Sequence, residues 1–291
     1  MNDRLMNNIV TGVDIGGTHI TSCLIDIDTG NPIEGSDARG DIDPHQNEEH
    51  IIRSWAETIA ASSKKHGIPM GHIGIAMPGP FDYEKGVSLI TGLHKYECLY
   101  KLNVKDMLSR ELGISTGDIR MMNDASAFLS GEAKSGAGKG CKHLAGITLG
   151  TGLGSAKFID GQCQDAELWR MPFRGSRAEE YLSSRWFISE YEKKTGKKVN
   201  GVRALADLAE TDTVARNLFE EFGYTLGEVL TRRFSDHFPE RIVVGGNISK
   251  AWHLFNSHCS SVVKEHAPEC MLIPARLGEN AALIGAACLW E

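Results

Sequence analysis

Asp124 is the acidic side chain that the sequence places best for general-base chemistry. It follows the apolar run I-R-M-M-N and precedes A-S-A-F-L-S-G-E-A, so it stands where a strand ends and a helix begins. Active-site groups of α/β folds commonly occupy that place. A carboxylate there can take the proton of a substrate hydroxyl that attacks phosphorus. Taken alone, Asn123 and Asp124 are more typical of a helix cap, because both residue types are favoured there.

A second acid, Asp14, opens the segment D-I-G-G-T at 14–18. Glycine within a strand loses packing and costs entropy, so it marks a bend or a place where another group approaches the backbone. An isolated Gly-Gly pair is more often a simple hairpin turn. Strand-like sequence continues on both sides, whereas Walker and Rossmann motifs run from a strand through glycines into a helix. Asp14 could hold Mg²⁺ through water, because magnesium prefers oxygen ligands and keeps several waters.

The opening segment has an echo in L-A-G-I-T-L-G-T-G-L-G-S at 144–155. At one constant offset, Gly12 aligns with Gly146 and Gly16 aligns with Gly150, and between them Val13 and Ile15 align with Ile147 and Leu149. Such an echo is typical of two duplicated cores. Two glycine turns could grip a phosphate chain from two sides, because successive backbone N–H groups form an anion-binding nest.

Three further features are weaker signals. Glu167 and Glu179 flank an irregular segment, and without context they read as solvated surface charge. The segment R-I-V-V-G-G-N at 241–247 predicts a strand that ends in paired glycines, where a flat ring could lie against bare backbone. The small residues of L-G-E-N-A-A-L-I-G-A-A-C-L at 277–289 predict a terminal helix that packs closely on another helix.

Other elements follow from periodicity and turn signals. A helix is expected from about Asn47, a strand over 72–77 that ends in a Pro-Gly-Pro turn, and a helix over 103–112. A chain of 291 residues fits two lobes or one large α/β domain.

The amino-acid composition limits the classes of binding partner that we expect for this protein. The chain has 31 basic and 38 acidic side chains, a net charge of -7, and its basic residues are scattered. Nucleic-acid binding needs a clustered positive face, so no nucleic-acid partner is expected. Seven cysteines without a Cys-x-x-Cys pair are typical of reduced thiols in the cytoplasm. No apolar run approaches the roughly 18 residues of a membrane span, so no membrane partner is expected.

Taken together, these segments resemble the ROK family of sugar kinases, within the actin/hexokinase/Hsp70-like ATPase superfamily. The matching motifs, in family order, are D-I-G-G-T at 14–18, M-P-G-P at 77–80, N-D-A at 123–125, L-G-T-G-L-G at 149–154 and I-V-V-G-G at 242–246. The resemblance implies a two-lobe, actin-like ATPase (ribonuclease H-like) α/β fold with duplicated mixed-sheet cores. It implies a small lobe over 1–121, completed by a C-terminal helix over 279–291, and a larger lobe over 122–278.

The resemblance also implies roles. Asp124 would be the general base in ATP-dependent phosphorylation of a hexose hydroxyl, with Mg²⁺ bound near Asp14 through water or phosphate. The sugar would contact Gly79, Asn123, Glu167 and Glu179. The nucleotide would contact Asp14, Gly16, Gly17, Thr18, Gly150, Thr151, Gly152, Gly245 and Gly246. A homodimer is the family habit.

The chain departs from the family pattern in one segment. Where the family has E-x-G-H, this chain has E-L-W-R, with Trp169 for the glycine and Arg170 for the histidine. The family's cysteine-rich zinc loop should follow, yet 171–179 holds no cysteine, so no structural zinc is expected. Arg170 could bond a substrate hydroxyl or pair with a nearby acid; pairing is favoured slightly.

Two other function classes remain as alternatives. ROK repressors share this body but carry a DNA-binding domain before the first phosphate loop, and thirteen residues before Asp14 are too few for one. A sugar-binding ATPase without phosphoryl transfer is the third class. The sugar itself and the hydroxyl that is phosphorylated are left open by the sequence.

Overall fold

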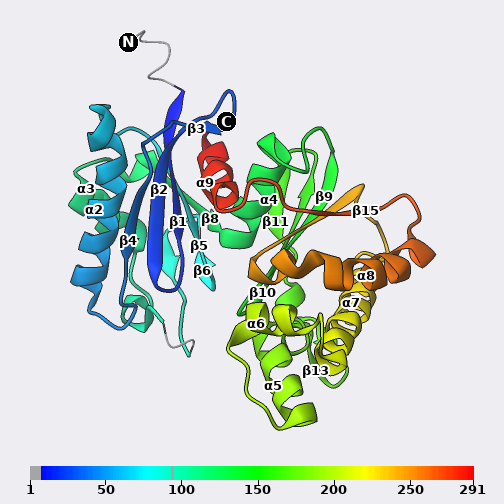
Figure 1. Ribbon diagram of the computed structural model, residues 1–291. Coiled ribbons are helices and arrows are strands. Elements are labelled where there is room, and N and C mark those ends of the chain that lie inside the picture. Colours follow the sequence, from blue (N-terminus) through cyan, green and yellow to red (C-terminus); the bar gives the residue numbers. More distant parts are fainter. Residues whose placement is uncertain (1–7, 93–94) are drawn as a thin grey trace. The chain divides into compact units, whose positions relative to one another are not determined.

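The computed structural model describes residues 8–92 and 95–291, whose contacts group into two units (Figure 1). One unit contains the residues up to Lys139 together with Glu279–Glu291, and the other contains Gly140–Gly278. We expected a boundary between 121 and 122. The contacts place 122–139 with the first unit instead, because the helix that begins at Asp124 packs on the terminal helix.

The first unit is built on a mixed sheet. Its strands are β1 (Ile9–Ile15), β2 (His19–Asp26), β3 (Asn31–Pro32), β4 (Ala38–Asp41), β5 (Ile73–Met77) and β8 (Ile119–Asn123), with a small separate hairpin of β6 (Phe81–Asp82) and β7 (Val87–Ser88). The order is β3-β2-β1-β5-β8, with β4 also paired to β2. β1 and β2 form an antiparallel hairpin, whereas β5 runs parallel to β1 and β8 runs parallel to β5.

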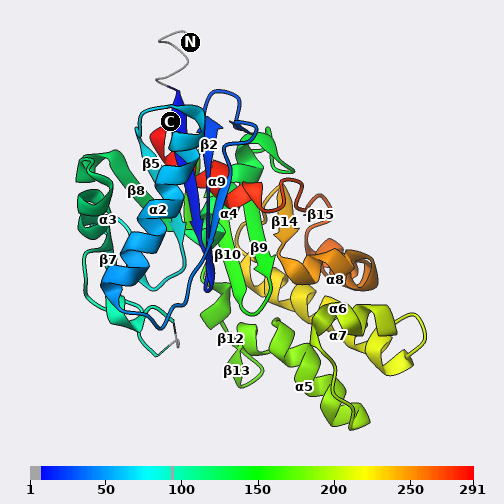
Figure 2. The same ribbon diagram turned by 60° about the vertical axis from the view of Figure 1, so that its left-hand side comes forward.

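Helices cover both faces of this sheet (Figure 2). They are α2 (Glu48–His66), α3 (Val104–Leu112), α4 (Asp124–Ser135) and α9 (Asn280–Ala287), with short 3₁₀ turns at Glu97–Leu99, Thr116–Asp118 and Cys288–Trp290. α2 begins where the sequence predicts, because the Asn47 side chain accepts the backbone N–H of His50 at 2.9 Å. The apolar face of α2 buries Ile51, Trp55 and Ile59 completely against the sheet.

On the opposite face of this sheet, α4, α9 and β5 pack closely against one another at glycine residues. A Cβ atom on Gly285 of α9 would lie 1.7 Å from the carbonyl oxygen of Ala127 in α4, and one on Gly131 of α4 would lie 2.0 Å from that of Ala281. A Cβ on Gly74 of β5 would meet an α9 carbonyl at 1.9 Å. Only glycine allows these backbones to approach so closely. The predicted close packing of the terminal helix is therefore confirmed.

The second unit repeats the sheet layout of the first. Its strands are β9 (His143–Leu149), β10 (Leu153–Ile159), β11 (Gln162–Asp165), β14 (Arg241–Gly245) and β15 (Met271–Pro274), in the order β11-β10-β9-β14-β15. β9 and β10 form an antiparallel hairpin, and β14 and β15 continue in parallel. β9 begins and ends at the same offset from β1 that aligns Gly12 with Gly146. The echo in the sequence thus corresponds to a duplicated core.

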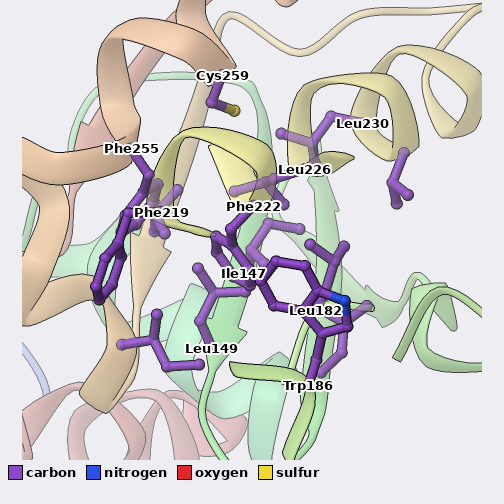
Figure 3. Close-up of a cluster of buried hydrophobic side chains, with 14 of the residues drawn as sticks. Ile147, Leu149, Leu182, Trp186, Phe219, Phe222, Leu226, Leu230, Phe255 and Cys259 are labelled. Carbon is purple, nitrogen blue, oxygen red and sulfur yellow. The ribbon is translucent and has the colours of Figure 1, made fainter. Parts of the chain in front are cut away.

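The remaining elements of this unit surround its core. They are the hairpin β12 (Pro172–Phe173) and β13 (Ser176–Arg177), the helices α5 (Ser184–Thr195), α6 (Gly201–Leu208), α7 (Thr213–Arg233) and α8 (Trp252–His266), and 3₁₀ turns at Leu168–Arg170, Ala178–Glu180 and Asn247–Ala251. Figure 3 shows Ile147 and Leu149 of β9 within the same cluster as Phe222 of α7. None of the helices among the described residues combines the length and the hydropathy of a membrane-spanning segment.

Candidate active site

Asn123 and Asp124 lie at the junction of β8 and α4, as the sequence predicts. Asn123 is the helix cap, because its Oδ1 accepts the N–H groups of Ala125 at 2.9 Å and Ser126 at 3.2 Å. Asp124 is the first helical residue, and its Oδ1 accepts the N–H of Ala125 at 2.8 Å. Burial raises the pKa of the Asp124 carboxyl, while the Ala125 N–H and the charge of Lys95 act in the opposite direction. A carboxyl with a raised pKa is a better proton acceptor once it is ionised.

Asp14 lies at the same end of the sheet as Asp124. In the strand register Asp14 is level with Ala76 of β5, and Ala76 is level with Met122 of β8. The pKa of Asp14 is raised to about 7, first by burial and then by the negative charges of Asp124 and Glu279. Glu279 is exposed and pairs with Arg39 at 3.6 Å. The parallel strands therefore bring two partly accessible carboxylates together at their carboxyl ends.

The first glycine turn, between β1 and β2, is held from two directions. The N–H of Gly16 donates to the carbonyl oxygen of His19 at 2.9 Å, and the carbonyl oxygen of Gly16 accepts the hydroxyl of Tyr96 at 2.7 Å. A Cβ on Gly17 would meet nothing within 4 Å. Among the described residues, no acceptor bonds the N–H of Gly17 or Thr18. Two backbone donors at the end of β1 are thus available to an anion.

The turn that carries Gly79 lies beside the cap of α4. The Tyr83 hydroxyl donates a hydrogen bond to the carbonyl oxygen of Met77 at 2.9 Å. It accepts one from the side-chain amide of Asn123 at 3.3 Å. A Cβ on Gly79 would lie 3.1 Å from that hydroxyl. The bond from Gly79 to Pro80 is cis. Tyr83 therefore bonds Asn123 and lies beside Gly79, two residues that the sequence predicts to contact the sugar, although no motif singled it out.

The second glycine turn, between β9 and β10, is braced by Glu179. Its Oε2 accepts the N–H of Leu153 at 3.0 Å, and a Cβ on Gly152 would lie 2.8 Å from the same oxygen. The other carboxyl oxygen faces Arg185 at 3.5 Å. Glu179 is therefore no free surface charge, and it contacts the turn that the sequence assigns to phosphate.

The paired glycines after β14 pack beside this second turn. Gly245 is level with Thr148 of β9 in the sheet. Gly246 has a φ of 85° in the left-handed region, and a Cβ there would lie 2.4 Å from the carbonyl oxygen of Leu149. Leu149 immediately precedes the turn of Gly150, Thr151 and Gly152. The second unit thus gathers the predicted phosphate turn and the predicted adenosine turn at one end of its sheet.

Glu167 lies just after the strand that pairs with β10. Its backbone has a φ of 51°, and its N–H donates to Asp165 Oδ1 at 2.7 Å. Its carboxylate forms an ion pair with the Arg170 guanidinium, the interaction that the sequence slightly favoured for that arginine. Both side chains are about half exposed, so the pair is accessible.

A hairpin occupies the segment where the family pattern, unlike this sequence, has a zinc loop. Phe173 of β12 is buried, with the guanidinium carbons of Arg174 and Arg232 at 4.8 and 5.0 Å from its ring centre. The Tyr181 hydroxyl donates to the carbonyl oxygen of Arg174 at 2.9 Å, and Arg174 pairs with Glu228 at 3.1 Å. Over 8–92 and 95–291, no three His, Cys, Asp or Glu side chains are arranged to hold a metal.

Each unit thus collects its own share of the predicted residues. The first brings together Asp14, Gly16, Gly17, Thr18, Gly79, Asn123 and Asp124 at one end of its sheet region, and the second brings Gly150, Thr151, Gly152, Glu179, Gly245 and Gly246 to one turn, with Glu167 in a separate segment. Sequence patterns missed Tyr83, Lys95 and Tyr96. These three belong to loops without a repeating pattern, and only the fold shows that Tyr83 and Tyr96 bond site residues and that the charge of Lys95 acts on Asp124.

The two sheets and their hairpins define a mixed α/β protein with a duplicated, actin-like fold. The chain aligns with a ROK family glucokinase from Streptomyces griseus, solved in complex with glucose and AMPPNP, at a TM-score of 0.78 and 24% identity over 97% of this chain and 98% of that one. It also aligns with a ROK family transcriptional regulator, a homologue of the E. coli MLC protein, at a TM-score of 0.79 and 17% identity over 97% and 77%. The predicted fold class is confirmed.

The chain belongs to the ROK family, whose model matches residues 10–166 and 172–291. The interval between the two matched ranges holds the E-L-W-R segment, where the sequence departs from the family pattern. A curated relative, the glucokinase of Thermotoga maritima, is 27% identical over 314 residues, which cover 96% of each chain. The family membership predicted from the five motifs is therefore confirmed.

Proposed function

We propose that the chain transfers the γ-phosphoryl group of ATP to a hydroxyl of a hexose or related sugar. The observation that carries this proposal is the grouping of Asp14, Asp124 and the unbonded N–H groups of Gly17 and Thr18 in one unit. Such a grouping offers a proton acceptor and an anion-binding turn close to each other. The glucokinase relative and the glucokinase of similar fold support a sugar as the acceptor.

Asp124 acts as general base in this proposal. It takes the proton of the sugar hydroxyl as the hydroxyl oxygen attacks the γ-phosphorus, and the bond from phosphorus to the bridging oxygen of ADP breaks. The Asn123 amide and Glu167 bind sugar hydroxyls. Glu179 is the second acid assigned to the sugar, and it also braces the glycine turn that is assigned to phosphate.

The glycine turns hold the nucleotide. Gly16, Gly17 and Thr18 offer backbone N–H groups to its phosphates, and Gly150, Thr151 and Gly152 do the same from the second unit. Gly245 and Gly246 lie beside the adenosine, where the absence of side chains leaves room for a flat ring.

Magnesium fits the acidic end of the first sheet. Asp14 has a raised pKa because its surroundings are buried and negative, and a divalent cation would favour its ionised form. The described residues offer no cluster of three ligands, so most coordination would come from water and phosphate, as magnesium prefers. When bound, the ion neutralises charge on the transferring phosphoryl group.

A sugar-responsive regulator is the competing function, since one protein of similar fold is a transcriptional regulator. The scattered basic residues and the net charge of -7 disfavour a DNA-binding role. Location in the cytoplasm, a homodimeric state and the absence of a structural zinc stay predictions.

The test is an ADP-release assay with ATP and Mg²⁺ over glucose, fructose, mannose, allose, N-acetylated hexosamines and β-glucosides, with each product identified by mass. We expect ADP release that depends on at least one sugar, with a phosphorylated sugar formed in equal amount. ADP release that is the same with and without every sugar would favour an ATPase without transfer. No ADP release under any condition would remove the kinase proposal.

A further inference from the structure

Tyr96 contacts the first glycine turn from the interior of the first unit. Its side chain is fully buried, and its ring meets that of Trp55 edge-on with centres 5.2 Å apart. Its backbone N–H donates to the carbonyl oxygen of Pro44 at 3.0 Å. Its hydroxyl donates to the carbonyl oxygen of Gly16 at 2.7 Å. Burial raises the pKa of Tyr96 far above any working pH, so the hydroxyl remains a donor.

The Tyr96 hydrogen bond fixes the direction of a neighbouring donor. A trans peptide is planar, so the carbonyl of Gly16 and the N–H of Gly17 point in opposite directions. Holding the Gly16 oxygen toward Tyr96 therefore directs the Gly17 N–H away from the interior. That N–H bonds no acceptor in the described part of the chain, and the space beside Gly17 is open. Glycine needs such a restraint, because its backbone is more mobile than that of any other residue.

The duplicated turn of the second unit has the same arrangement. Gly150 is the counterpart of Gly16 at the constant offset, and its carbonyl oxygen accepts the N–H of Ser184 at 2.8 Å. The N–H groups of Thr151 and Gly152 bond no acceptor among the residues described. In both units, the first glycine carbonyl is held by a donor from another segment and the following N–H is left available. Only in the first unit is that donor a side chain, which a substitution can remove.

We propose that Tyr96 is a positioning residue for the nucleotide's phosphates, because its hydroxyl holds the Gly16–Gly17 peptide so that the Gly17 N–H meets the β- or γ-phosphate. The proposal rests on the proposed kinase function, since it assigns phosphate to this turn. It is separable from that function, since it concerns nucleotide binding and needs no sugar.

The test compares Tyr96→Phe with the wild type by calorimetric titration of AMPPNP, ADP and AMP in the presence of Mg²⁺ and without sugar. Losing one hydrogen bond that orients a phosphate donor should weaken AMPPNP binding about 3- to 10-fold. AMP has neither a β- nor a γ-phosphate, so its affinity should change by less than about twofold. Steady-state kinetics should show a higher KM for ATP with little change in the KM for sugar.

Two control variants separate the hydrogen bond from packing. Tyr191→Phe removes another buried tyrosine hydroxyl, which donates to Asp212 at 2.7 Å in the second unit. Ile51→Val alters the packing of the buried cluster that contains Tyr96 while leaving Trp55 and the Tyr96 hydroxyl in place. Both variants should bind AMPPNP within about twofold of the wild type.

Three results would overturn the inference. Tyr96→Phe could bind AMPPNP as tightly as the wild type, or it could lose AMP and AMPPNP affinity equally, or Ile51→Val could lose the same AMPPNP affinity. In each case the proposed function survives. A wild-type protein that binds no adenine nucleotide would overturn both.

Discussion

The negative charge of Asp124 is one of the causes that raise the pKa of Asp14, and the two carboxyls lie at the same end of one sheet. Burial is the larger cause. Without a cation, the folded protein holds Asp14 protonated at a pH where an ordinary aspartate is ionised. The proposed chemistry needs negative charge there for magnesium, so function and stability make opposite demands on this residue.

This conflict predicts a pH-dependent gain of stability in Asp14→Asn. The folded-state pKa of Asp14 is about 7 against an ordinary 3.8, so between these values the folded state binds more protons than the unfolded state. The contribution to stability is therefore fully present below about pH 4 and is lost as the pH rises through about 7. At pH 8, without nucleotide or Mg²⁺, the Tm of Asp14→Asn should exceed that of the wild type by at least about 2 °C.

The difference in Tm should shrink toward pH 5, measured by thermal unfolding at several pH values. Asp82→Asn is a control of opposite sign, because the N–H of Lys85 lowers the pKa of Asp82. Asp82→Asn should not be stabilised at pH 8. An Asp14→Asn protein that is less stable than the wild type at pH 8 would show that the ionised side chain is well compensated in the fold.

The close contact of α4 and α9 predicts that Gly285→Ala strongly lowers the free energy of unfolding. Alanine favours helices by about 1 kcal/mol over glycine, so an uncrowded site would be stabilised. At Gly285 the new Cβ would lie 1.7 Å from a backbone oxygen of α4, so one helix must move. We expect a loss of at least about 2 kcal/mol in the free energy of unfolding, measured in urea.

Gly71→Ala is the matched control for this packing, because a Cβ at Gly71 would meet nothing within 4 Å. It should leave the free energy of unfolding within about 0.5 kcal/mol of the wild type. Equal stability of the two variants would contradict the packing of α9 against α4.

Glu167→Gln is predicted to weaken the binding of the acceptor sugar. A hydrogen bond to a charged group contributes about 1.5–3 kcal/mol, so the KM for sugar should rise about 10-fold or more, while AMPPNP affinity stays unchanged. The control is Glu180→Gln, since Glu180 pairs with Arg177 at the same i,i+3 spacing and with similar exposure. Exposed pairs contribute little to stability, so neither variant should lower Tm by more than about 2 °C. A Glu167→Gln enzyme with the sugar KM of the control would remove Glu167 from the sugar site.

The local elements could be predicted from the sequence because their signals are short-range. The Asn47 cap, the strand-to-helix junction at Asp124 and both glycine hairpins depend on residues within a few positions of one another. The duplicated core could be predicted because Gly12 and Gly146, which match in the sequence repeat, occupy equivalent positions in the equivalent strands β1 and β9.

The remaining site contacts could not be predicted because they are made across long stretches of chain. Tyr96 reaches Gly16 from a loop without periodicity, and Glu179 reaches the N–H of Leu153. Surface charge was a fair interpretation of Glu179 from sequence alone. The unit boundary also depends on a distant partner, since α4 joins the first unit through the terminal helix.

The assignment of Asp124 as general base is tested most directly by the kcat of Asp124→Asn for phosphorylated-sugar formation, measured beside AMPPNP affinity. Asparagine keeps the size of the side chain but cannot accept the proton. We expect kcat to fall by about 10²- to 10⁴-fold, with AMPPNP affinity within about threefold of the wild type. A variant that forms phosphorylated sugar at close to the wild-type rate would contradict the account, because the reaction would then need no carboxylate at the start of α4.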